Sequence, residues 1–301
     1  MSLNSAMRQL PVILISFSIL VAGAAAQDFD KVEIQIVNAG DGIYMLSGAG
    51  GNIGVCVGED GVFLIDDQFA PLNAKIMAAV ASLSDKPVKF LVNTHWHADH
   101  TGGNELLGEA GAIIVAHENV RKRLSTRQFV DLFDRTVEPL AKAGLPVVTF
   151  AEAVTFHFND KEIAVFHVDP AHTDGDAVIY FENSNVMHTG DLLFSGRYPI
   201  IDVQNGGSVD GMIRAADRLM GMIDDNTVLI PGHGALADKK KLVEFRAMLS
   251  TIRDRVKDKV DRGFSLEKII ESKPTADFDE EWGGSFSPDR MVAIIYNDLT
   301  K

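Results

Sequence analysis

The chain has 301 residues, of which 42 are acidic and 28 are basic, so its formal net charge at pH 7 is −14. This length corresponds to one large domain or two small ones, and the acidic balance argues against nucleic acid as a partner. The single cysteine, Cys56, excludes an internal disulfide. It lies in an apolar run, so we expect a buried small side chain rather than a nucleophile.

Residues 1–26 have the pattern of a secretory signal peptide. Arg8 supplies a positive charge, residues 10–21 form an apolar core, and three alanines precede a cleavage point before Gln27. The apolar core is short for a membrane span, although an N-terminal anchor is the alternative. We therefore expect a periplasmic or secreted protein, with residues 27–301 as one domain that has no membrane contact after cleavage.

Four short strands are predicted between Val32 and Asp66, because apolar runs alternate with Gly, Asn and Asp clusters as in antiparallel hairpins. Their cores are residues 32–37, 42–47, 52–57 and 62–65. The glycine-rich turn at residues 48–51 is expected to be unusually flexible. An amphipathic helix is predicted at residues 71–84, with Asp67 as its better capping candidate.

The most informative stretch is N-T-H-W-H-A-D-H-T-G-G-N at residues 93–104, directly after an apolar strand at residues 87–92. In an extended chain His95 and His97 point the same way. Asp99 and His100 then need a bend, and this geometry suits two adjacent metals rather than one. A buried imidazole cluster without metal would need many separate hydrogen-bond partners, so a chance run of histidines is disfavoured.

Further elements are predicted after this loop. A strand at residues 112–116 precedes a helix from Glu118, and the charged residues 126–146 are expected to form a helix and a loop near the mouth of the site. The later strands are expected at residues 147–150, 154–158, 163–168, 177–181, 185–187 and 228–230. His157 and His167 lie in two of these runs and are expected to be satisfied core or edge histidines. A long loop at residues 192–207, an amphipathic helix at 208–223 and a long helix capped by Asp238 complete the prediction.

The run His95-x-His97-x-Asp99-His100 resembles the signature of the metallo-β-lactamase superfamily. The family has a further histidine later in the chain, then an acid or cysteine, and a last histidine near a Pro-Gly turn. Here these positions are occupied by His172, Asp191 and His233. The resemblance extends over residues 32–256. It implies an enzyme with an α/β fold, the αββα four-layer sandwich of two mixed β-sheets with helices outside.

The resemblance also implies two zinc ions per chain, bound by two sets of ligands: His95, His97 and His172 at the first, and Asp99, His100 and His233 at the second. Asp191 would bridge the two ions. A shared hydroxide would attack a carbonyl carbon, with Asp99 as the catalytic carboxylate that orients it. Asp66 and His188 would support the ligands from behind.

The residue at position 191 bears on the substrate. Secreted metallo-β-lactamases with the most similar spacing carry cysteine there, whereas glyoxalase II-type thioesterases, lactonases and many broad hydrolases carry aspartate. The cysteine-type enzymes also place lysine three residues later, where this chain has Phe194, so β-lactamase activity is expected to be weak. Arg197 is the alternative contact for a drug carboxylate, and Tyr198 and Asn205 of the same loop are further candidate substrate contacts.

Three classes of function remain open. The first is an exported binuclear zinc hydrolase that attacks a strained or activated carbonyl of a small molecule, such as a β-lactam, a lactone or the thioester of a glyoxalase II-like enzyme. The second is a persulfide dioxygenase, which shares the loop motif but uses one iron. Metal analysis and oxygen uptake separate these two. The third is a non-catalytic metal-binding protein, which the complete ligand set disfavours.

Overall fold

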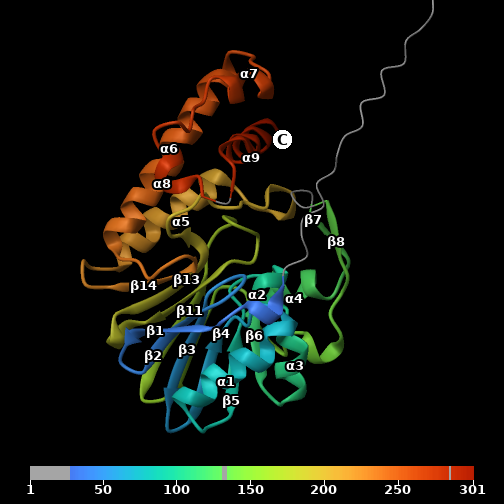
Figure 1. The fold of residues 1–301 in the computed structure, drawn as a ribbon, viewed down its shortest axis with the longest axis vertical. Coiled ribbons are helices and arrows are strands. Elements are labelled where there is room, and N and C mark those ends of the chain that lie inside the picture. Colours follow the sequence, from blue (N-terminus) through green and yellow to red (C-terminus); the bar gives the residue numbers. More distant parts are fainter. Residues whose placement is uncertain (1–27, 131–133, 285) are drawn as a thin grey trace, which may run out of the picture.

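The computed structural model describes residues 28–130, 134–284 and 286–301, so the predicted signal peptide lies outside the described residues. Two β-sheets pack face to face, and helices cover their outer faces (Figure 1). This is the four-layer αββα sandwich that the sequence predicted. Within the described ranges, no helix has both the length and the apolar character needed to cross a membrane.

The first sheet has seven strands in the order β1-β2-β3-β4-β5-β6-β9. They are β1 (Gln35–Gly40), β2 (Ile43–Ser47), β3 (Ile53–Gly58), β4 (Gly61–Ile65), β5 (Val88–Val92), β6 (Ile113–His117) and β9 (Val148–Phe150). The first four form consecutive antiparallel pairs, as predicted. The neighbouring strands β4, β5, β6 and β9 are parallel to one another. The helices that connect these strands include α1 (Asn73–Leu83), α2 (Ala98–Thr101), α3 (Asn104–Glu109) and α4 (Glu118–Leu124).

The second sheet has five strands in the order β10-β11-β12-β13-β14. They are β10 (Ala153–Phe158), β11 (Lys161–His167), β12 (Ala177–Phe181), β13 (Val186–Phe194) and β14 (Val228–His233). The first four are antiparallel, and β14 is parallel to β13. The helices associated with this sheet are α5 (Val209–Met222), α6 (Lys239–Asp261), α7 (Leu266–Glu271), α8 (Asp279–Trp282) and α9 (Pro288–Thr300).

The central strands are buried on both faces, so alternate side chains enter different layers. In β4, Phe63 and Ile65 point into the core between the sheets, whereas Val62 and Leu64 pack under α1. Cys56 is fully buried in the core between the sheets, and burial raises the pKa of its thiol. It therefore packs as the small apolar side chain that the sequence predicted.

Three local predictions were wrong. Among the described residues of 126–146, β7 (Gln128–Val130) pairs with β8 (Arg135–Val137), since their aromatic and β-branched residues favour pairing, and the helical part is a single 3-10 turn at Lys142–Gly144. The loop expected from residue 192 begins later, because β13 continues to the buried Phe194. Asp67 does not cap α1; its Oδ1 accepts the N–H of Gly103 after the ligand loop (2.8 Å).

His157 and His167 of the second sheet lie outside the ligand cluster. His157 is exposed on the edge strand β10. His167 contacts the carbonyl oxygen of Asp176 through Nδ1 (2.8 Å) and stacks on the ring of His117 (centroids 3.9 Å apart). Both are thus edge or satisfied histidines, as expected.

Candidate metal centre

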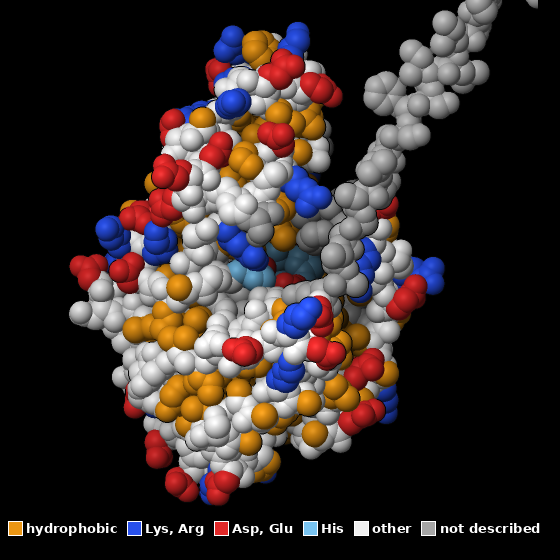
Figure 2. Space-filling model, viewed as in Figure 1, with side chains coloured by type: hydrophobic (Ala, Val, Ile, Leu, Met, Phe, Trp, Pro, Cys, Tyr) orange, Lys and Arg blue, Asp and Glu red, His pale blue; other side chains and the backbone are white. Residues whose placement is uncertain are grey.

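All seven predicted metal ligands meet at one edge of the two sheets, and histidine side chains are visible at the bottom of a hollow (Figure 2). The ligands come from the turn after β5, from α2, from the loop before β12, and from β13 and β14. The first ligand set is His95, His97 and His172. The second is Asp99, His100 and His233. In each set the candidate donor atoms lie within 4.8 Å of one another.

Asp66 connects the end of β4 to the ligand loop. Strands β4 and β5 are parallel neighbours, so both chains leave the sheet at the same edge. Oδ1 of Asp66 accepts the N–H of Thr94 (2.8 Å), and Oδ2 lies 2.7 Å from Nδ1 of His100. Asp66 has a φ of +60°, a costly conformation that clusters at functional sites. Its carboxylate holds the proton of His100 on Nδ1 and leaves Nε2 free as a donor to metal.

Each histidine of the first set has one nitrogen engaged by the protein. Nδ1 of His95 lies 3.0 Å from the hydroxyl of Thr94, and Nδ1 of His172 lies 2.8 Å from the carbonyl oxygen of Ile200. In His97 the two nitrogens exchange roles: Nε2 contacts the protein, 3.0 Å from Oδ2 of Asp202, and Nδ1 faces the cluster, 2.9 Å from Nε2 of His172. The remaining nitrogens therefore point into one shared space.

Asp191 lies between the two sets. Its Oδ2 is 3.4 Å from Nε2 of His172 in the first set and 3.4 Å from Nε2 of His233 in the second. Its Oδ1 is 3.2 Å from Nε2 of His100. Asp99 is the more accessible carboxylate, with 29% of its side chain exposed, and its Oδ2 lies 3.4 Å from Nε2 of His233.

Two buried atoms of the cluster, Nε2 of His95 and Oδ1 of Asp191, make no hydrogen bond to the described residues, since Nε2 of His100 lies 3.2 Å from Oδ1 of Asp191 without hydrogen-bond geometry. A buried polar atom without a partner is costly. A divalent cation would satisfy both atoms, and a mixture of imidazole and carboxylate donors suits zinc. The residues present therefore fit the metal that the family implies.

The electrostatics of the cluster favour ligand-competent protonation states at His95, His172 and Asp191, whereas at His100 the surrounding carboxylates favour the charged ring. Burial lowers the pKa of His172 to about 4 and that of His95 well below its usual range, so both rings are neutral at pH 7. Burial also opposes the charged form of His100, but the surrounding carboxylates, Asp191 foremost, outweigh it and raise the pKa. Burial of Asp191 is likewise outweighed by the histidines around it, His233 foremost, and its pKa lies well below its usual range.

The glycine-rich turn at residues 48–51 packs directly against the ligand loop. The N–H of Gly51 donates to the carbonyl oxygen of Asp99 (3.1 Å), and the side-chain amide of Gln68 donates to the carbonyl oxygen of Gly51 (2.6 Å). A Cβ at Gly51 would collide with the ring of His100. The glycine is therefore required by a close approach at the second ligand set.

Asp202 contacts the candidate ligand His97, and the sequence did not reveal this support. Asn205 donates from Nδ2 to both carboxylate oxygens of Asp202 (3.0 and 2.9 Å), and Arg123 of α4 donates to Oδ1 of Asn205 (2.8 Å). Asp202 and Asn205 form a local turn, which is a recognisable pattern. The contact from Asp202 to His97 spans 105 residues, and no local pattern encodes it.

The structure does not bring three of the four predicted substrate contacts to an open surface. Phe194 is fully buried and stacks on the ring of His233, with centroids 5.1 Å apart. Tyr198 is fully buried, and its hydroxyl donates to Oδ1 of Asp279 at α8 (2.8 Å). Asn205 is buried behind Asp202. Arg197 is partly exposed, with its guanidinium carbon 5.3 Å from the centre of the Phe194 ring.

His188 is fully buried and supports the backbone beside Asp191 rather than a ligand side chain. Its Nδ1 accepts the N–H of Gly190 (3.1 Å), and its Nε2 lies 3.2 Å from the carbonyl oxygen of Asn52. Burial lowers the pKa of His188 to about 4, so the ring is neutral and donates from Nε2.

The chain is similar to several known proteins. The hydroxyacylglutathione hydrolase of Pelagibacter ubique (strain HTCC1062) is 28% identical over 148 residues, which cover 46% of this chain and about half (54%) of that relative. The solved structure of a metallo-β-lactamase from Pontibacter korlensis matches this chain with a TM-score of 0.61 at 20% identity. The match covers 72% of this chain and 99% of the lactamase chain.

A variant of the sec-alkyl sulfatase PisA1 has a TM-score of 0.66 at 16% identity, covering 90% of this chain and 51% of that enzyme. At these identities the structural likenesses show the fold. The family model described as the metallo-beta-lactamase superfamily matches residues 47–233, which is more than half of the chain. Together with the ordered ligand set, this match places the chain in the metallo-β-lactamase superfamily.

Proposed function

We propose that the protein is an exported hydrolase that uses two zinc ions to cleave a strained or activated carbonyl compound: a β-lactam, a lactone or a thioester. The observation that carries the proposal is the position of Asp191 between two ligand sets, with its Oδ2 3.4 Å from one histidine of each. A carboxylate can donate one oxygen to each of two metals. The relative named hydroxyacylglutathione hydrolase supports hydrolysis of an acyl compound.

The two ligand sets would hold one ion each, and Asp191 would contact both. When bound, zinc would lower the pKa of water and polarise the carbonyl group of the substrate. The protein contributes orientation: Asp66 and Asp202 each fix one histidine ring through its outer nitrogen. The partly exposed carboxylate of Asp99, whose Oδ2 lies 3.4 Å from Nε2 of His233, would orient the attacking water.

The position of Phe194 favours a thioester or lactone over a β-lactam. Phe194 stands where a related lactamase presents lysine, and it is buried against His233, so it offers no charge to a drug carboxylate. A charge-assisted hydrogen bond contributes about 1.5–3 kcal/mol. Its absence corresponds to roughly a ten- to hundredfold loss of efficiency.

The test combines metal quantification with a substrate panel of nitrocefin, lactones and thioesters. We expect close to two zinc ions per chain, good turnover of a thioester or an uncharged lactone, and poor turnover of nitrocefin. One iron per chain with oxygen uptake would instead indicate a persulfide dioxygenase. Export is tested separately, by the N-terminal residue of the protein recovered from the periplasm or medium, which we expect to be Gln27.

A further inference from the structure

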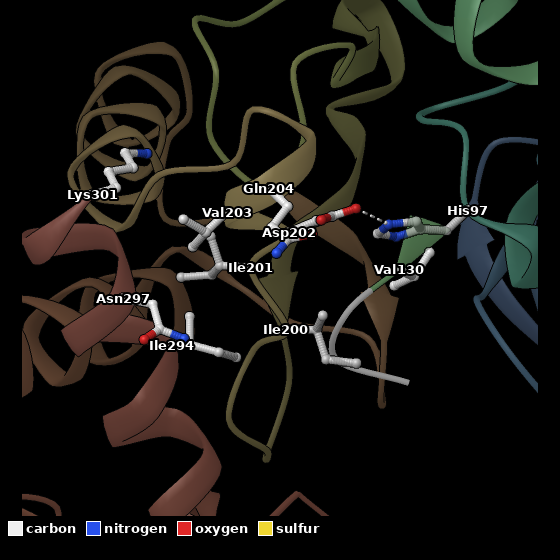
Figure 3. A pocket seen from close by; sticks show the side chains of 10 residues that line it. All are labelled: His97, Val130, Ile200, Ile201, Asp202, Val203, Gln204, Ile294, Asn297 and Lys301. Carbon is white, nitrogen blue, oxygen red and sulfur yellow. Dashed lines mark hydrogen bonds and ion pairs between the residues drawn. The ribbon is translucent and has the colours of Figure 1, made fainter. Parts of the chain in front are cut away.

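A cavity of about 520 Å³ opens beside His97 (Figure 3). His97 lies at one end, and Ile294, Asn297 and Lys301 of the C-terminal segment lie at the other, as Figure 3 shows. This volume falls in the range of small-molecule sites. Because one wall is a side chain of the first ligand set, a molecule in the cavity would reach the metal centre.

The walls of this cavity are mainly branched aliphatic side chains. They come from β7, from the segment after β13 and from α9: Val130, Ile200, Ile201, Val203 and Ile294. Val130, Ile201 and Ile294 are buried, whereas Asn297 and Lys301 are exposed at the solvent end. The middle of the cavity is therefore apolar, and its polar groups lie at the two ends: His97 and Asp202 at the inner end, and Asn297 and Lys301 at the solvent end.

The charged groups of the cavity are already paired. Asp202 lies against His97 (3.0 Å), and the ammonium of Lys301 lies 2.6 Å from Oδ1 of Asp298. Asp202 carries a negative charge, and the cation of Lys301 lies at the solvent end of the cavity, opposite His97. Arg197 and Phe194 do not line this cavity. An anionic group among the aliphatic walls between these ends would lose its hydration without a cation in contact, so an uncharged chain is favoured there.

We propose that this cavity binds the acyl chain of the substrate, and that the substrate class is a thioester with an uncharged aliphatic acyl chain. This assignment rests on the proposed hydrolase function and names its substrate. The cavity contacts the first ligand set through His97 and is not lined by Asp99 or His233 of the second. The leaving thiol would then depart on the side of the second set, away from the aliphatic walls.

The experiment uses the zinc-loaded full chain and acyl thioesters of N-acetylcysteamine with acetyl, butanoyl, hexanoyl and adipoyl groups. Each methylene that enters the cavity should raise kcat/KM by up to about fourfold, until the cavity is filled. The adipoyl compound has the six-carbon length of the hexanoyl compound but ends in a carboxylate, so we expect it to be at least about tenfold poorer. Equal kcat/KM for the acetyl and hexanoyl compounds would overturn the proposal while leaving the hydrolase function intact.

A matched pair of valine variants locates the effect. Val203 lines the cavity and is half-buried, whereas Val243 is exposed on α6. Val203→Trp should fill the cavity and reduce the hexanoyl-to-acetyl ratio of kcat/KM towards one. Val243→Trp should leave that ratio unchanged. An unchanged ratio in Val203→Trp would place the acyl chain elsewhere and overturn the proposal.

A binding measurement separates the cavity from the chemistry. N-methylhexanamide carries the same hexanoyl chain on an unreactive amide, and calorimetry should detect its binding to the native protein but at least tenfold weaker binding to Val203→Trp. If no thioester is hydrolysed while this pattern of binding holds, the proposed reaction fails and the aliphatic preference of the cavity is supported. If N-methylhexanamide does not bind the native protein, the acyl-chain assignment is wrong.

Discussion

The two ligand sets differ in what lies behind them. The second set is backed by the rigid interior: the carboxylate of Asp66 at the end of β4, the glycine turn at Gly51, and the buried ring of Phe194. The first set is backed on its open side by a loop, through Asp202 and the carbonyl oxygen of Ile200. The same loop lines the cavity. Substitutions around the first set can therefore change substrate preference, whereas those around the second set should disturb metal binding and folding first.

Asp191→Asn should have the largest effect, because it removes the group shared by both sets. The amide keeps the shape of the side chain but loses the negative charge, so we expect zinc to be lost from both sets and turnover to fall by at least about 100-fold. Elemental analysis and thioester hydrolysis measure the two effects. Asp225→Asn, at an exposed position, is the matched control. Full zinc content with normal turnover would refute the shared role of Asp191.

Asp66→Asn and Asp202→Asn remove the support of one ligand set each: Asp66 lies behind the second set, and Asp202 lies behind the first. Each removes a carboxylate that fixes one ligand histidine, and loss of such a partner typically costs about 10- to 100-fold in metal affinity. Asp66→Asn should weaken the second set and also destabilise the fold, since Asp66 is fully buried and accepts hydrogen bonds from Thr94. Asp202→Asn should weaken the first set with less effect on stability. Cobalt titration followed by absorption, with thermal unfolding in parallel, distinguishes these patterns; identical effects of the two variants would remove the contrast.

The sequence predicted which residues form the two ligand sets, but only part of what lies behind each set. The clustering of the seven candidate ligands was predictable because the ligand loop is local and the later candidates follow it in family order. The support from Asp202 was not, because it depends on a contact across 105 residues. The orientation of Phe194 was also hidden, since the pairing of β13 with β14 is irregular between Gly190 and Phe194, and simple alternation fails there.

The wall formed by α9 lies beyond the region of resemblance, so its role in the cavity could be found only from the structure. The β7–β8 hairpin was missed for a related reason. It is short, and it is held by tertiary contacts such as the bond from Nδ2 of Asn205 to the carbonyl oxygen of Phe129 (3.2 Å). Local preferences in a charged segment of this kind are too weak to decide between a helix and a hairpin.

Gly51→Ala tests the rigidity behind the second set. The new Cβ would collide with the buried ring of His100, and overpacking of this kind typically costs about 1–3 kcal/mol of unfolding free energy. Denaturant unfolding of the zinc-free and zinc-loaded protein measures that cost. The control is Gly221→Ala in α5, where a Cβ meets no atom within 4 Å. There the higher helix propensity of alanine should stabilise the protein by about 0.5–1 kcal/mol. Destabilisation of similar size in both variants would show that the contact with His100 is unimportant.

Arg123→Gln should have the smallest effect, and it sharpens the description of the first set. Arg123 pairs with both oxygens of Asp174 (2.6 Å each) and donates to Asn205, which in turn holds Asp202 against His97. Glutamine can keep one hydrogen bond but not the charge or the two-pronged pairing. Because three residues separate Arg123 from the metal, we expect about a two- to fivefold loss of metal affinity at the first set, with the second set unaffected.

The matched control is Arg127→Gln, since Arg127 pairs with Glu138 on the exposed surface and exposed pairs contribute about 0–1 kcal/mol. Cobalt titration of both variants measures the two sets separately. If Arg123→Gln weakens both sets equally, the network stabilises the whole edge of the sheets rather than His97. If it matches Arg127→Gln, then Asn205 alone is sufficient to hold Asp202, and the first set is less dependent on its loop than the comparison with the second set implies.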